Sequence, residues 1–277
     1  MISRCTRCLV FILLAGAAFF GVLPAAMAAA APADDPALVA AVNSPQRSAA
    51  FEARDKYRHP LAALSFFGLK PGMTIVEIWP SGGYWTEILA PFAKATGGRY
   101  FAAVAKEGQT LPAQFANTAV YGTIQYTVFN DKSGPLVAPG TADFVLTSRN
   151  IHDWTDQPGY AEKAMRDFYA ALKPGGILAV VDHRADPRPM VDQGSNGYLS
   201  TAYVVGLAEK AGFQLEAKSE INANPKDTKD HPFGVWTLPP TLRSAPPGQP
   251  PNPKFDKAKY QAIGESDRMT LRFRKPG

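Results

Sequence analysis

The sequence predicts a doubly wound α/β fold, in which helices cover both faces of a mostly parallel sheet with an antiparallel C-terminal strand. Apolar segments of strand length alternate with helical segments between residues 74 and 210, and unbroken apolar strands are typical of a buried parallel sheet. The first strand ends in Glu77 and passes through a Pro/Gly-rich turn into a helix. Doubly wound proteins begin a nucleotide or nucleoside site in this order.

The first 28 residues have the pattern of a signal peptide. Arg4 and Arg7 precede an apolar core at residues 9–23, and Ala26-Met27-Ala28 provides a small-x-small cleavage site. The apolar core is short for a bilayer span of roughly 20 residues. We therefore expect an exported, periplasmic or secreted protein that keeps no stable membrane anchor after cleavage.

The composition limits what the mature chain can do. Both cysteines lie in the predicted signal peptide, so disulfides, thiolate metal sites and Cys nucleophiles are excluded after cleavage. Without the two leader arginines the net charge falls to +3. That charge is small and dispersed, and no basic run is interleaved with aromatic residues, so nucleic acid is not an expected partner. We expect a small-molecule substrate; the sequence does not indicate an oligomeric state.

Residues 29–60 form an N-terminal extension in this prediction. Residues 29–43 are read as a flexible lead-in, and Ser44 as the N-cap of a helix that runs to about Tyr57. His59-Pro60 then breaks the helix. A second helix at residues 61–67 begins the α/β domain, which covers residues 61–277.

Within this domain the predicted strands and helices follow from apolar periodicity and turn residues. The predicted parallel strands are 74–78, 99–105, 125–129, 143–148 and 177–182, and residues 213–219 and 269–274 form a final antiparallel pair. The predicted helices are 86–94, 111–116, 160–172 and 199–210. The Pro-rich stretch at 239–253 is predicted to be a loop rather than a second domain.

With this order the chain resembles the class I S-adenosylmethionine-dependent methyltransferases, and most of all a bacterial group of exported, predicted methyltransferases. The matching segments are Val76-Glu77-Ile78-Trp79-Pro80-Ser81-Gly82-Gly83-Tyr84-Trp85-Thr86, Ser148-Arg149-Asn150-Ile151-His152-Asp153-Trp154, Leu172-Lys173-Pro174-Gly175-Gly176, Val181-Asp182-His183-Arg184-Ala185, and Ser266-Asp267-Arg268 leading to Arg272-Phe273-Arg274-Lys275-Pro276. The resemblance implies a Rossmann-like methyltransferase fold and S-adenosylmethionine as cofactor.

The resemblance also implies which residues hold that cofactor. Glu77 would accept a hydrogen bond from the amino group of the methionine moiety, while Gly82 and Gly83 would let the backbone approach the ligand. Glu107 would stand in for the family's ribose-binding acid, and Asp131 would face the adenine. The sequence departs from the family pattern at two of its three glycine positions, where it has Trp79 and Ser81.

Two histidines follow the fourth and fifth predicted strands. His152 and Asp153 follow one strand, and Asp182 and His183 follow the other, so all should meet at the carboxyl edge of the sheet. A neutral histidine there could take the proton of a nucleophile, which makes His152, Asp153 and His183 the candidate catalytic residues. The alternative is a structural hydrogen-bond network. Neither pair has a typical metal-ligand spacing, so no metal is predicted.

Methyl transfer to a small or lipid-like acceptor is the function that this sequence favours. The alternatives are a ligand-binding module that has lost cofactor use, or a hydrolase or lyase built on the His/Asp cluster. Arg54 and Arg58 precede the α/β domain and could bind an anionic substrate, although a solvated helix face is the favoured interpretation. The aromatic residues of the proposed site mouth are either a cation-attracting wall or packing side chains; they are Trp79, Tyr84, Trp85 and Trp154.

Overall fold

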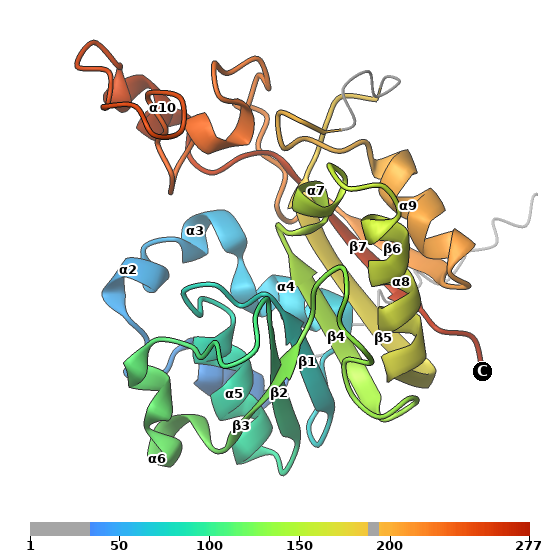
Figure 1. Ribbon diagram of the computed structural model, residues 1–277. Coiled ribbons are helices and arrows are strands. Elements are labelled where there is room, and N and C mark those ends of the chain that lie inside the picture. The colour runs from blue at the N-terminus through green and yellow to red at the C-terminus, as the bar shows by residue number, and fades with distance from the viewer. Residues whose placement is uncertain (1–33, 188–193) are drawn as a thin grey trace, which may run out of the picture. The chain divides into compact units, whose positions relative to one another are not determined.

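A seven-stranded sheet in the order β3-β2-β1-β4-β5-β7-β6 forms the centre of the structure, a computed structural model (Figure 1). Strands β1 to β5 are parallel, and β7 runs antiparallel to both β5 and β6. The strands are β1 Thr74–Ile78, β2 Arg99–Val104, β3 Ile124–Val128, β4 Ala142–Ser148, β5 Leu172–His183, β6 Gln214–Ser219 and β7 Arg268–Arg274. The predicted doubly wound α/β fold with an antiparallel C-terminal strand is confirmed.

The structure describes residues 34–187 and 194–277. The predicted signal peptide, residues 1–28, lies outside the described residues. Among the described residues, no helix has both the length and the apolar character needed to cross a bilayer.

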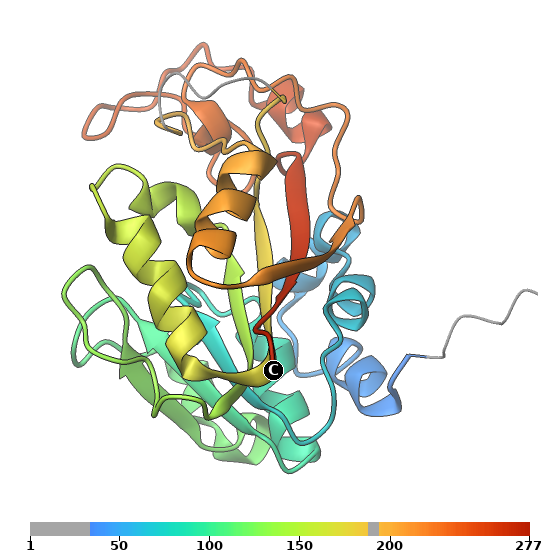
Figure 2. The ribbon, with the colours of Figure 1, turned by 90° about the vertical axis from the view of Figure 1, so that its right-hand side faces the viewer.

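Helices cover both faces of the sheet, as Figure 2 shows. Alternate strand residues supply the two cores: Ile75 packs with α1, α4 and α5, whereas Val76 packs with α7, α8 and α9. The helices are α1 Pro36–Val42, α2 Ala49–Glu52, α3 Asp55–Arg58, α4 Pro60–Phe67, α5 Thr86–Ala95, α6 Thr118–Tyr121, α7 Ile151–Trp154, α8 Tyr160–Ala171, α9 Thr201–Lys210 and α10 Lys257–Ile263, with 3-10 helices η1 Ala113–Ala116 and η2 Gly234–Thr237.

The topological switch point lies between β1 and β4. These strands pair directly, with Ile78 opposite Thr147, while β1 leads outward to β2 and β4 leads outward to β5. Just beyond the strand ends, Asn150 Nδ2 donates to the carbonyl oxygen of Ile78 at 2.8 Å. The segments that follow β1 and β4 therefore meet at the carboxyl edge, where doubly wound folds bind ligands.

The flexible lead-in predicted for residues 29–43 is wrong over its described part, because residues 36–42 form helix α1. Asp35 caps this helix by accepting hydrogen bonds from the backbone N–H groups of Ala37 and Leu38, and Pro36 occupies the first turn. Leu38 is buried against the core that contains α5. The Ala/Pro-rich composition concealed a short capped helix, which gains its stability from tertiary packing.

The single helix predicted from Ser44 to about Tyr57 is also wrong. The segment forms two short helices, α2 and α3, which are separated at Ala53 and Arg54. Tertiary contacts outweigh the local helix propensity here. Ser48 N donates to the Glu87 carboxylate on α5 at 2.9 Å, and Arg47 forms a two-point ion pair with Asp55.

Smaller differences concern the predicted helix at 111–116 and the region between β6 and β7. The predicted helix is a 3-10 turn, η1, and β5 begins at Leu172, five residues before the predicted start. Helix α10 was not predicted. The Pro-rich stretch at 239–253 is irregular, as expected, and lies between η2 and α10. In Figure 1 the chain between β6 and β7, coloured orange to red, runs above the sheet edge that carries α7.

Candidate functional site

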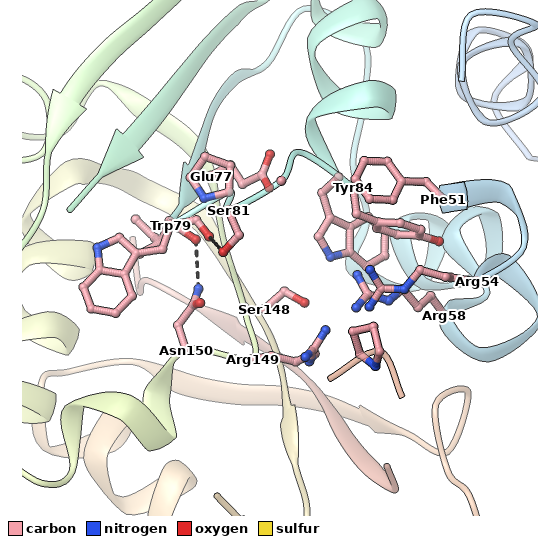
Figure 3. A pocket seen from close by; sticks show the side chains of 15 residues that line it. Phe51, Arg54, Arg58, Glu77, Trp79, Ser81, Tyr84, Ser148, Arg149 and Asn150 are labelled. Atoms are coloured by element: carbon pink, nitrogen blue, oxygen red, sulfur yellow. Dashed lines mark hydrogen bonds between the residues drawn. The ribbon is translucent and has the colours of Figure 1, made fainter. Parts of the chain in front are cut away.

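A cavity of about 240 Å³ lies at the switch point between β1 and β4 (Figure 3). The turn after β1, the residues after β4 and the segment of α2 and α3 surround it. Its lining residues are Phe51, Arg54, Arg58, Glu77, Ile78, Trp79, Pro80, Ser81, Gly82, Tyr84, Trp85, Ser148, Arg149, Asn150 and Pro240. Since it stands at the carboxyl edge beside the β1 turn, this cavity is the candidate ligand site.

The turn after β1 has a backbone that normally requires glycine. Trp79 has φ +46°, Ser81 has φ +53° and Gly83 has φ +94°. A non-glycine residue in the left-handed region is strained, and such strain persists at functional sites when the surroundings enforce it. The backbone therefore keeps a left-handed conformation at all three of the family's glycine positions, although the sequence keeps glycine at only one.

The Trp79 side chain does not occupy the cavity around the arginines. In Figure 3 its ring points away from Arg54 and Arg58. The indole Nε1 donates to the carbonyl oxygen of Phe129 at 2.8 Å, and the ring packs edge-on against Trp154 at 5.5 Å between centroids. Trp154 is completely buried. These two tryptophans are packing side chains and not a wall for a cation.

Glu77 is a buried carboxyl group beside the cavity. Its Oε2 accepts hydrogen bonds from Thr86 Oγ1 at 3.0 Å and from the Tyr100 hydroxyl at 2.6 Å. Burial raises the pKa of Glu77 to about 7, although the two hydrogen bonds favour the charged form. Both hydrogen bonds go to one oxygen, so the carboxyl group keeps acceptor capacity for a ligand.

A cluster of arginines forms the opposite wall of the cavity. Arg54 Nε and Arg58 Nε donate to Glu265 at 2.7 and 3.0 Å, and Arg268 Nη1 donates to the same carboxylate at 2.6 Å. Arg149, which follows β4, extends toward Arg54 and Arg58 in Figure 3. One carboxylate thus pairs with three guanidinium groups, and a fourth lies nearby.

Burial and mutual repulsion shape the pKa values of this cluster. Burial lowers the pKa of Arg58 to about 10, which leaves it charged at neutral pH. Burial alone would raise the pKa of Glu265, but Arg268, Arg58, Arg149 and Arg54 outweigh it, so the pKa lies far below its usual range. Because guanidinium groups stay charged in proteins, four arginines around one carboxylate give the cluster a net positive charge.

The predicted His/Asp residues come together beside this cavity but do not line it. His152 Nδ1 lies 2.8 Å from Asp182 Oδ1, and the rings of His152 and His183 are 4.8 Å apart. His183 Nδ1 forms a short hydrogen bond with Ser266 Oγ, and Arg149 Nε donates to His183 Nε2 at 3.4 Å. Asp153 Oδ1 lies 3.4 Å from His152 Nε2 and is half exposed. Arg149 therefore separates His183 from the cavity.

The two histidines have opposite pKa shifts. Burial, followed by the charges of His152 and Arg149, holds the pKa of His183 well below its usual value, so this ring is neutral. Burial would also lower the pKa of His152, but Asp182 raises it by charge and by hydrogen bonding, and the net shift is upward. Nitrogen and oxygen atoms of His152, Asp182 and His183 lie within 4.8 Å of one another, in keeping with their predicted positions at the carboxyl edge.

The predicted cofactor residues fall into two groups. Glu77 and Gly82 line the cavity, and Gly83 packs against η1, where a Cβ atom would lie 2.2 Å from the Phe115 ring. Glu107 and Asp131 are exposed and line neither this cavity nor a second one of about 150 Å³ across the β1 turn. The second cavity is lined by Trp79, Pro80, Ser81, Val104, Ala105, Gln109, Thr110 and Leu111.

Three features of the site were missed at the level of sequence. Arg58 was interpreted as part of a solvated helix face, but it is 5% exposed. Glu265 was not considered as a site residue, and Trp85 was considered only as part of an aromatic wall, not as a hydrogen-bond donor. The i,i+4 spacing of Arg54 and Arg58 was the available signal, because it places both side chains on one side of a helical turn. Their partner Glu265 is more than 200 residues away, so no local pattern could reveal it.

No family model matches this chain. The ubiquinone/menaquinone biosynthesis C-methyltransferase UbiE of Klebsiella pneumoniae is 28% identical over 155 residues, which is 54% of this chain and 56% of the relative. The corresponding protein of Hydrogenovibrio crunogenus is 26% identical over 141 residues, 49% of this chain and 52% of that protein. The chain thus spans about half the length of the curated relatives it matches.

Solved structures share the fold at low identity. The [4+2]-cyclase SpnF superposes with a TM-score of 0.55 and 15% identity, covering 85% of each chain. A putative sarcosine dimethylglycine methyltransferase from Galdieria sulphuraria superposes with a TM-score of 0.51 and 13% identity, covering 79% of this chain and 86% of its own. The protein therefore has the Rossmann-like fold of class I methyltransferases. Since a cyclase shares it, the fold alone does not define the reaction.

Proposed function

We propose that this protein transfers a methyl group from S-adenosylmethionine to a small or lipid-like acceptor. The observation that carries the proposal is the β1 turn, which keeps a left-handed backbone at Trp79 and Ser81 beside the cavity-lining carboxyl group of Glu77. Such backbone strain is expected at a site where the backbone must approach a ligand closely. The match to curated C-methyltransferases over half of the chain gives further support.

The residues at the switch point suit this cofactor. When bound, S-adenosylmethionine supplies an electrophilic methyl group. Glu77 offers an acceptor for the cofactor's amino group, and the exposed residues Ser81 and Gly82 leave the turn backbone open to it. The second cavity, next to the end of β2, lies on the side where the resemblance places the ribose. No carboxylate lines it within residues 34–187 and 194–277, so the affinity should be weak.

The role of the histidines follows from their placement. His183 contacts Arg149 and Ser266 rather than the cavity, so we assign it to positioning Arg149. The proton-transfer role predicted from the sequence for His152, Asp153 and His183 stays a prediction. Glu77 is the cavity-lining group whose pKa lies near neutrality, and it could hold or release a proton as the ligand binds.

Titration calorimetry with S-adenosylmethionine and S-adenosylhomocysteine tests the proposal. We expect weak binding, because losing a charge-assisted contact to the ribose costs about 1.5–3 kcal/mol, which is roughly ten- to over a hundredfold in affinity. Glu77→Ala should weaken binding by a further factor of roughly ten, whereas the exposed Glu107→Ala should change it little. Absence of binding at millimolar cofactor would reject the proposal and favour a ligand-binding module.

We also propose that the protein is exported, on the basis of the charged, apolar and small-x-small order of residues 1–28. Intact-mass measurement of the protein from a periplasmic extract tests this. The expected mass corresponds to a chain that begins near residue 29. A mass that retains residue 1 would contradict export by cleavage.

A further inference from the structure

The cavity wall formed by α2, α3 and the β4 end carries more positive charge than its protein partners neutralise. Arg54, Arg58 and Arg149 line the cavity, and Arg268 lies behind them. Within the described residues, Glu265 is the carboxylate that forms ion pairs with members of this cluster. Buried charges in proteins are normally matched by opposite charges, so this excess calls for an anion.

The same wall has buried hydrogen-bond donors without partners. Arg54 Nη2, Arg58 Nη2 and the indole Nε1 of Trp85 are buried and make no hydrogen bond to any residue that the structure describes. All three belong to residues that line the cavity. An unpaired buried donor is costly, and more than nine in ten buried polar groups in native proteins have a partner. Three such donors around one cavity indicate a site for a ligand that accepts hydrogen bonds.

The guanidinium groups are held in position before any ligand arrives. Glu265 fixes Arg54 and Arg58 through their Nε atoms. The Arg58 guanidinium also stacks over the Tyr84 ring, 4.3 Å from its centroid. Each of these two arginines therefore keeps its Nη2 group for another partner. A planar guanidinium group with a free edge matches carboxylate and phosphate oxygens.

We propose that this cavity binds an anionic group, a carboxylate or a phosphate, of the methyl acceptor through Arg54, Arg58, Arg149 and the Trp85 indole N–H. The assignment to an acceptor rests on the proposed function. The cofactor's own carboxylate is the other source of the same chemistry. The acceptor is favoured because Arg54, which precedes α3, and Arg58, which ends it, lie across the cavity from Trp79 and Ser81 of the β1 turn.

Inorganic phosphate is the probe for the anion site, titrated into the purified full chain by calorimetry. Arg54→Gln is the main variant, because this side chain is 19% exposed and its loss leaves Glu265 paired with Arg58 and Arg268. We expect phosphate affinity to fall roughly ten- to a hundredfold, the worth of one charge-assisted contact. Arg166→Gln removes the same charge from an exposed site on α8 and should bind phosphate like the unaltered protein.

A second variant protects the test against misfolding. Arg58→Lys keeps the charge beside Glu265 but removes the guanidinium edge, and we expect it to weaken phosphate binding while retaining the fold by circular dichroism. The inference is overturned if the unaltered protein does not bind phosphate at tens of millimolar. It is equally overturned if both variants bind phosphate as tightly as the Arg166→Gln control.

Repeating the phosphate titration with saturating S-adenosylhomocysteine shows whether the arginines bind the acceptor's anionic group or the cofactor's carboxylate. If phosphate binds with unchanged or higher affinity, the arginines serve the acceptor, as proposed. If S-adenosylhomocysteine excludes phosphate, the arginines hold the cofactor's carboxylate and the acceptor assignment is overturned. Failure of S-adenosylhomocysteine to bind at all rejects the proposed function and with it the acceptor assignment, whereas the Arg54→Gln result still decides whether the anion site exists.

Discussion

Glu77 shows how much one buried carboxyl group can depend on its surroundings. It lies at the end of an apolar strand and forms no ion pair within the described chain; its partners are the hydroxyl groups of Thr86 and Tyr100. Burial raises its pKa from 4.5 to about 7. The folded protein therefore holds a proton on Glu77 at pH values where the unfolded chain has released it.

This pKa shift predicts the direction of a pH effect on stability. Because the folded state binds the proton more tightly, the contribution of Glu77 to unfolding free energy falls as pH rises from 4.5 to 7, by up to about 3 kcal/mol. Glu77→Gln removes the titration and can still accept both hydroxyl hydrogen bonds. In urea unfolding, we expect the variant to gain unfolding free energy relative to the unaltered protein as the pH rises from 5 to 8. The exposed Glu107→Gln should show no such gain, and parallel pH profiles for Glu77→Gln would contradict the shifted pKa.

At the scale of elements, the conformation of the β1 turn and the packing of η1 are linked at Gly83. Gly83 has φ +94°, and a Cβ atom there would lie 2.2 Å from the Phe115 ring on η1. Gly83 is thus required by both backbone conformation and packing. Gly82, its neighbour in the sequence, has neither constraint, since a Cβ atom would meet only the Phe51 ring at 3.5 Å.

These two glycines make a matched pair of substitutions. Gly83→Ala should lower the unfolding free energy by about 2–5 kcal/mol, because left-handed strain adds to overpacking against Phe115. Gly82→Ala should cost less than about 1 kcal/mol, since an ordinary contact can accommodate the methyl group. Urea unfolding measures both. Equal effects of the two substitutions would mean that η1 moves away freely and does not constrain the turn.

At the scale of the whole described structure, Glu265 forms ion pairs with arginines from distant parts of the sequence. Through it, Arg54 and Arg58 of the N-terminal segment are paired with the residues that lead into β7. The carboxylate is 3% exposed. A buried carboxylate among several arginines matters most when it is removed, because the remaining cations lose their compensation.

Glu265→Gln should therefore lower the unfolding free energy at pH 7 by about 3–5 kcal/mol. The pKa of Glu265 is lowered on folding, so its stabilisation is complete above the unfolded value of 4.5 and is lost as pH falls toward the folded pKa. Glu216→Gln is the control: that side chain is 32% exposed and pairs with Arg272 and Arg274. Urea unfolding should find a loss below about 1 kcal/mol for it. A similarly small loss for Glu265→Gln would show that the arginines are hydrated.

The sequence alone determined the sheet and the edge that carries the site. Apolar periodicity and turn residues are local signals, so the strands, their alternation with helices and the convergence of Glu77, His152 and His183 at the carboxyl edge could be read from them. Tertiary structure decided what those signals do not contain. The burial of Arg58 against Glu265, the direction of the Trp79 ring and the separation of α2 from α3 depend on residues distant in the chain. Long-range pairing and packing energies determine these features. Because of them, the helix face that the sequence predicts to be solvated lines the cavity instead.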